Sequence, residues 1–78
     1  MEMKDLITYI AKSLVDQPDS VKITEVEGET ISVIELSVAK EDIGKIIGKN
    51  GKTIAAIRAL TNGAAGRIGK RVNVEILD

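Results

Sequence analysis

The sequence of 78 residues contains neither cysteine nor histidine. Thiolate and imidazole are the usual protein ligands of zinc and iron–sulfur sites, and they are principal groups of nucleophilic catalysis. The composition therefore excludes the common metal centres as well as thiol and Ser-His chemistry. We expect no metal site and no cofactor.

Aromatic residues are almost absent, because Tyr9 stands alone and there is neither phenylalanine nor tryptophan. Domains of the four-stranded RRM type stack bases on aromatic side chains of a sheet, and this sequence has no such set. That class of RNA reader is excluded. The hydrophobic core has to be built from Ile, Val, Leu and Ala.

Long apolar runs are also lacking, and residues 1–5 show neither the basic stretch nor the apolar segment of a signal peptide. We expect a soluble, cytoplasmic protein without a membrane segment. Hydrophobic residues make up 44% and charged residues 29%, a balance typical of a folded chain. The length accommodates one core, so we predict a single domain over residues 1–78.

The charges are segregated along the chain, although the net charge is only −1. Residues 1–42 carry ten acidic and four basic side chains, a balance of −6. Residues 43–74 carry no acidic side chain and these seven basic ones: Lys45, Lys49, Lys52, Arg58, Arg67, Lys70 and Arg71. Such clustering creates a positive field that attracts phosphate groups. The alternative is a solvated surface whose bases pair with acids of the first half.

Apolar periodicity and turn residues predict six elements in the order αββααβ. The second strand should contain a bulge, because its apolar residues change phase between Val33 and Ile34. The last helix should bend or fray near Asn62-Gly63 and Gly66, with Gly69 as its cap. The expected elements are helix 4–15, strand 21–24, strand 30–38, helix 43–47, helix 52–68 and strand 72–76.

One motif stands between the two expected central helices: Ile46-Ile47-Gly48-Lys49-Asn50-Gly51-Lys52-Thr53-Ile54. It resembles the signature of KH domains, which is two apolar residues, Gly-x-x-Gly, two further residues and Ile. Residues 12–18 and 69–72 are also similar to the small free-standing bacterial KH proteins of the KhpA family. The resemblance covers nearly the whole chain and implies a type II KH domain of the α+β class, with three helices on one face of a three-stranded sheet.

The chemistry of the motif suits a nucleic-acid backbone. Glycine lacks a Cβ atom, so a loop with Gly48 and Gly51 can turn sharply and admit a sugar-phosphate chain closely. The loop also opens a helix, whose free N–H groups and dipole favour an anion. Lys49 and Lys52 add positive charge. KH domains clamp about four nucleotides with this loop.

On the resemblance, RNA bases would lie in an apolar groove between the two central helices and the second strand. Helical spacing alone favours a core position for Ile43 and Ile46, and core remains an alternative for the other isoleucines. For Gly44 the alternative is close helix packing. The candidate RNA-binding residues are Gly44, Lys45, Ile47, Gly48, Lys49, Asn50, Gly51, Lys52, Thr53, Ile54, Ile57 and Arg58.

A nucleotide-hydrolysing enzyme is a poor match, although Gly51-Lys52-Thr53 imitates the end of a Walker A loop. That motif needs glycine where this sequence has Ile46, and it follows a strand instead of a helix. We predict no enzyme. The stronger alternative is a protein-interaction module, because the alanines of the last helix offer a smooth surface for another protein.

The resemblance further implies an RNA chaperone or post-transcriptional regulator that acts on single-stranded RNA. Proteins of this kind act as homodimers or with a larger KH-containing RNA-binding protein, and they are linked to cell-wall and cell-shape control. Composition and spacing identify neither the RNA targets nor the partner.

Overall fold

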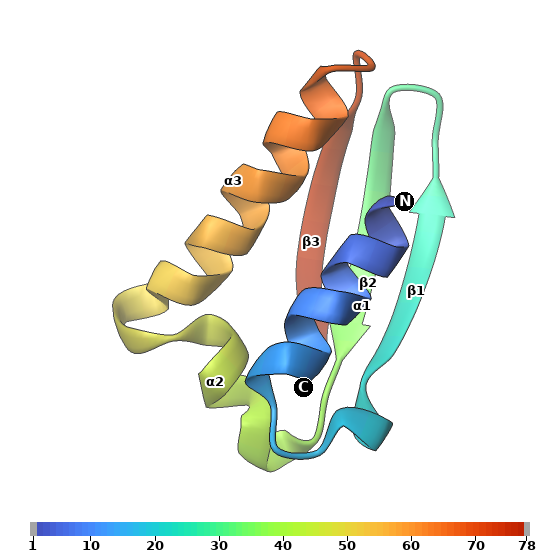
Figure 1. Cartoon of the computed structure of the whole chain (residues 1–78). Coiled ribbons are helices and arrows are strands. Elements are labelled where there is room, and N and C mark those ends of the chain that lie inside the picture. The colour runs from blue at the N-terminus through green and yellow to red at the C-terminus, as the bar shows by residue number, and fades with distance from the viewer. Residues whose placement is uncertain (1, 78) are drawn as a thin grey trace.

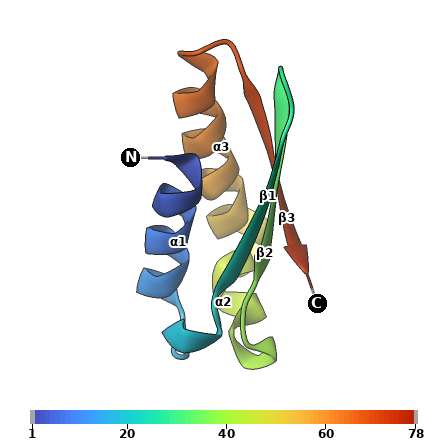
Figure 2. The same ribbon diagram turned by 90° about the vertical axis from the view of Figure 1, so that its right-hand side faces the viewer.

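The computed structural model describes residues 2–77 as three α-helices packed against a three-stranded sheet (Figure 1). The helices all lie on one face of the sheet, as Figure 2 shows from the side. The elements are α1 (Met3–Leu14), β1 (Lys22–Glu27), β2 (Ile31–Ser37), α2 (Ile43–Ile47), α3 (Lys52–Gly66) and β3 (Arg71–Leu77). Short 3₁₀ turns occupy Pro18–Ser20, Lys40–Asp42 and Lys49–Gly51. The predicted α+β class and the order αββααβ are confirmed.

The central strand of the sheet is β2. It pairs antiparallel with β1 through a tight hairpin and parallel with β3. The parallel pair needs a crossover, and α2, the loop and α3 form it. This connection carries the Gly48–Gly51 loop to one side of the molecule, at the left in Figure 1.

The register of β2 is continuous against both neighbouring strands, so the predicted bulge is wrong. Ser32 is buried and shares the helix-covered face with Ile34 and Leu36, whereas Ile31 and Val33 lie on the opposite face. The change of apolar phase therefore marks a strand with hydrophobic side chains on both faces. A small polar residue takes one inward position, and the pairing is not interrupted.

The predicted bend in the last helix is also absent. The amide of Asn62 binds the α3 carbonyl of Arg58 on one side and the N–H of Val72 on the other, which stabilises this part of the helix. Gly69 has a φ of +72°, and Lys70 N–H donates to the carbonyl of Ala65 at 3.0 Å. These are features of a Schellman ending, so the predicted cap at Gly69 is confirmed.

The core lies between the sheet and the helices, and its hydrophobic side chains are all aliphatic, with Ser32 and Thr61 as buried polar residues. Within residues 2–77, no helix is both long and apolar enough to span a bilayer. The strands β2 and β3 contribute their inward side chains, each helix adds one face, and β1 adds the half-buried Ile23. The buried hydrophobic members of the core are Ile7, Ala11, Val15, Ile34, Leu36, Val38, Ile46, Ile54, Ile57, Ala65, Val72 and Val74.

Candidate nucleic-acid interface

The loop between α2 and α3 has a backbone conformation that depends on glycine. Gly48 ends α2 with φ +76° and ψ +171°, a region that is essentially restricted to glycine. Asn50 (φ 58°, ψ 25°) and Gly51 (φ 73°, ψ 14°) follow in the left-handed region. Asparagine is one of the few other residues that adopt this conformation readily. Three unusual backbone positions within four residues turn the chain from α2 into α3.

The two glycines are required for different reasons. A Cβ atom at Gly48 would overlap the hydroxyl of Thr53 and lie 2.8 Å from the backbone nitrogen of Thr53. At Gly51 a Cβ atom would meet nothing within 4 Å, so only the positive φ favours glycine there. Gly48 therefore permits close packing of the loop on α3, and Gly51 leaves one side of the loop open.

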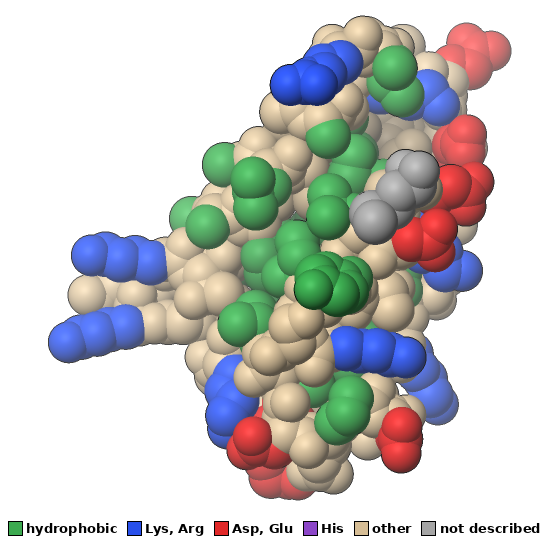
Figure 3. Space-filling model, in the orientation of Figure 1, with side chains coloured by type: hydrophobic (Ala, Val, Ile, Leu, Met, Phe, Trp, Pro, Cys, Tyr) green, Lys and Arg blue, Asp and Glu red, His purple; other side chains and the backbone are tan. Residues whose placement is uncertain are grey.

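The basic side chains near the loop fall into two groups. Lys49 and Lys52 are exposed, and no ion pair is recorded for either within the described part of the chain. Figure 3 shows basic side chains projecting from the left side of the molecule, where α2 meets α3. Lys45, by contrast, binds Asp16 at 2.9 Å and lies 3.7 Å from Asp42.

The hydrogen bond to Asp16 and the charges of Asp16 and Asp42 raise the pKa of Lys45 above its ordinary value. Lys70 likewise pairs with Glu27 at 3.4 Å. The alternative in which bases pair with acids from the first half thus applies to these two lysines. Lys49 and Lys52 therefore supply the solvent-facing positive charge at the loop itself.

The helical residues predicted to line the groove differ widely in exposure. Gly44 has open space where a Cβ would be, so it does not serve close helix packing. Ile47 is 39% exposed beside it. Ile54 and Ile57 are 7% and 3% exposed and belong to the core, as does the fully buried Ile46. Among the predicted groove isoleucines, Ile47 offers the most surface to a ligand.

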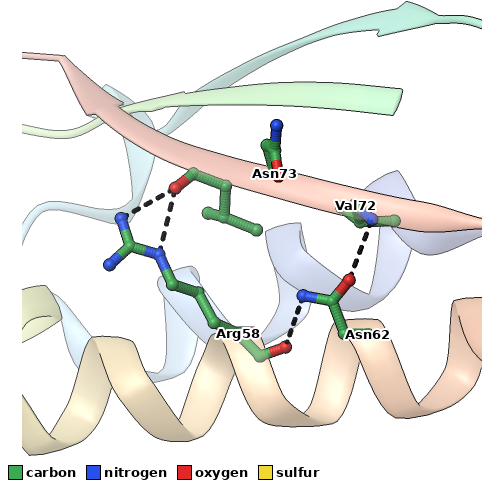
Figure 4. A pocket seen from close by; sticks show the side chains of 5 residues that line it. Arg58, Asn62, Val72 and Asn73 are labelled. Atoms are coloured by element: carbon green, nitrogen blue, oxygen red, sulfur yellow. Dashed lines mark hydrogen bonds between the residues drawn. The ribbon is translucent and has the colours of Figure 1, made fainter. Parts of the chain in front are cut away.

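Arg58 is exposed, and its guanidinium reaches the outer edge of β3. Its guanidinium donates two hydrogen bonds to the carbonyl of Val74, from Nε at 3.2 Å and from Nη2 at 2.9 Å. One helical turn later, Asn62 accepts a bond from the N–H of Val72 at 3.0 Å. Figure 4 shows both side chains reaching from α3 to the strand. They cover an edge that would otherwise present free backbone groups.

A recess of about 270 Å³ lies between these contacts, lined by Arg58, Asn62, Val72, Asn73 and Val74. The second strand, predicted as a wall of the base groove, does not line this recess. Because β2 is paired on both sides, the strand edge beside α3 belongs to β3. Asn62 and Asn73 were not identified from the sequence as residues that line this recess. No local pattern could do so, because strand order depends on contacts between distant parts of the chain.

A family model described as the KH domain of KhpA/KhpB matches residues 4–76. A Chlamydia pneumoniae protein named RNA-binding protein KhpA is 54% identical over 76 residues, which cover 97% of each chain. A protein of the same name from Clostridium acetobutylicum is 53% identical, covering 96% of this chain and all of that one.

Two solved structures of Era share the fold. Aquifex aeolicus Era bound to GDP and AlF4⁻ superimposes with a TM-score of 0.64 at 23% identity over 95% of this chain. Era in complex with MgGDPNP and nucleotides 1506–1542 of 16S ribosomal RNA gives the same TM-score and identity. This chain spans 29% and 28% of those chains, so the likeness concerns one part of Era and the fold alone.

Proposed function

This chain belongs to the KhpA/KhpB family of KH domains, and on that premise we propose that it binds single-stranded RNA through the Gly48–Gly51 loop. The observation that carries the proposal is the conformation of the loop. Its backbone is held by glycine-dependent angles, its outer side is open, Lys49 lies within it and Lys52 directly follows it. A phosphate group can approach such a backbone closely and find positive charge there.

The bases would lie beside the loop, over Gly44 and Ile47 of α2 and towards the recess between α3 and β3. Gly44 leaves room for a planar ring, and Ile47 supplies an exposed apolar contact. Buried Ile54 and Ile57 support this wall from inside the core. An unstacked base can enter such a groove, whereas a base held in a duplex cannot, which favours single strands.

The test replaces Lys49 and Asn50 together with Asp. The change places two carboxylates where a phosphate would lie and alters the local charge by −3, so RNA binding should be lost. Folding should be preserved, because both side chains are exposed and aspartate tolerates the left-handed conformation at residue 50.

A matched control replaces Lys4 and Ser13 of α1 with Asp, which gives the same charge change at two exposed residues away from the loop. This control should bind RNA nearly as the parent does. Such a result would show that the loop variant loses binding through repulsion at the loop and not through its net charge. Binding is measured by gel shift with single-stranded RNA after circular dichroism has confirmed folding. If the loop variant folds and retains the parental affinity, the loop is not the phosphate contact.

We also propose self-association, or docking to a larger KH-containing RNA-binding protein, through the apolar surface of α1 and α3. Leu60 is 60% exposed, and it lines an open depression of about 500 Å³ together with Leu6, Ala59, Gly63, Ala64 and Arg67. Figure 3 shows hydrophobic side chains gathered over these two helices. Two linked weak sites bind RNA more tightly than one.

The test is Leu60→Asp, compared with Lys12→Asp on the exposed side of α1. Sedimentation should show that the first variant is monomeric at concentrations where the parent and the second variant associate. A parent that remains monomeric and captures no KH-containing partner would contradict this part of the proposal.

The cellular role that we propose is that of a cytoplasmic, non-catalytic RNA chaperone or post-transcriptional regulator, with a contribution to cell-wall and cell-shape control. Its support is family membership together with the binding surface described above. Deletion of the gene should alter cell dimensions and the abundance of RNAs that crosslink to the protein. Complementation by the Lys49/Asn50 double variant should fail.

A further inference from the structure

Asp42 is the one charged side chain within residues 2–77 that is fully buried, with 1% of its surface exposed. Its carboxylate accepts hydrogen bonds from the backbone N–H groups of Asp16 at 3.2 Å and Gln17 at 3.0 Å. Lys45 Nζ lies 3.7 Å away. Burial of a charge is costly unless it is hydrogen-bonded, so this carboxylate is held firmly in one place.

Two neighbours strengthen the same junction. Lys45 bridges Asp16 and Asp42, and Gln17 donates from Nε2 to the carboxylate of Glu41 at 2.7 Å. The chain that leaves α1 is therefore bound by residues that immediately precede or begin α2. This set of polar contacts joins segments about 25 residues apart.

The helix that follows Asp42 is too short to hold its own direction. α2 has five residues, and isolated helices of that length are unstable in water. Asp42 and Ile46 are four residues apart, so they point to the same side of the helix, and both are buried. Ile46 is the apolar anchor of α2 and Asp42 is the polar one. The loop begins at Gly48, only two residues beyond Ile46.

From this arrangement we infer that Asp42 is a positioning residue for RNA binding. Its hydrogen bonds to residues 16–17 fix the direction of α2, and this direction determines how the Gly48–Gly51 loop is presented. The inference rests on the proposed RNA-binding function. Asp42 itself touches no RNA, because its side chain is enclosed by protein. Without Asp42, α2 would be held by the apolar contacts of Ile46 and the half-buried Ile43, and such contacts have no preferred direction.

The experiment compares Asp42→Asn with Ile34→Val, a matched core change in the central strand. The asparagine keeps the shape of the side chain but replaces one acceptor oxygen with a donor, so one backbone N–H loses its partner. RNA affinity is measured under conditions in which all proteins are folded, and amide hydrogen exchange is followed at residues 48–53.

We expect Asp42→Asn to bind RNA at least about fivefold more weakly and to exchange faster at residues 48–53. Ile34→Val should bind with parental affinity and exchange as the parent does in the loop. If Asp42→Asn does not fold, Asp42→Glu is used, because it keeps both acceptors and displaces them by one methylene group.

If Asp42→Asn binds RNA with the affinity of the parent, and its loop amides exchange at the rate of the parent, the inference is overturned. Equal losses in the asparagine and valine variants would also overturn it, because general stability would then explain the effect. A parent that binds no RNA contradicts the proposed function instead, and loop exchange still decides whether Asp42 positions the loop.

Discussion

Gly48 packs so closely on Thr53 that no side chain fits between them: a Cβ atom at Gly48 would lie 2.6 Å from Cβ and 2.8 Å from the backbone nitrogen of Thr53. Thr53 belongs to the first turn of α3, so this contact joins the end of α2 to the start of α3. The loop is therefore packed closely against the start of α3, and its conformation depends on this contact.

We predict that Gly48→Ala lowers the free energy of unfolding by about 2–4 kcal/mol, because backbone strain and steric overlap both act. Gly51→Ala should cost only about 1 kcal/mol, since the methyl group enters open space and only the positive φ is unfavourable. Urea denaturation measures both. Equal losses would contradict the different roles assigned to the two glycines.

The salt dependence of RNA binding should reflect the two loop lysines alone. With roughly −0.7 per phosphate for single strands, Lys49 and Lys52 give a log–log slope of about −1.4. Lys45→Gln should leave this slope unchanged, because Lys45 is engaged by Asp16. Fluorescence titrations at several salt concentrations measure the slope. A shallower slope in the Lys45 variant would mean that Lys45 leaves Asp16 to contact RNA.

Lys45 should also contribute to stability in a pH-dependent way. Its pKa is raised in the folded protein, so its pairing with Asp16 stabilises the fold fully below the ordinary value of 10.5, and the contribution is lost as pH rises through the higher folded value. The difference in melting temperature between the parent and Lys45→Gln should therefore persist at neutral pH and shrink above pH 10.5. A difference independent of pH would argue against an ion pair.

The face of the sheet without helices carries a like-charge pair. Glu35 and Glu75 are direct partners in the parallel register of β2 and β3, and both point away from the core. Glu75→Lys should raise the free energy of unfolding by about 0.5 kcal/mol, because attraction replaces repulsion. Glu75→Gln should have a smaller effect in the same direction. RNA affinity should not fall, since this face lies opposite α2 and α3.

Local patterns predicted the elements well, because helix and strand periods are properties of neighbouring residues. The short helix at Ile46, the loop glycines and the cap at Gly69 all followed from such patterns. These patterns failed where the structure of a segment depends on residues that are distant in the sequence. The phase change at Val33 indicated a bulge, yet the outer face of β2 has apolar residues of its own.

The sequence by itself determined the αββααβ order, the single core and the position of the Gly48–Gly51 motif between two helices, because these depend on local residue types and spacing. Only the tertiary structure decided which charges and strand edges are engaged by other parts of the protein. It pairs Lys45 with Asp16, turns Arg58 onto the carbonyl of Val74, and makes β3 instead of β2 the strand beside α3. Contacts between residues 16 to 29 positions apart depend on how the elements pack, and no local pattern encodes that packing.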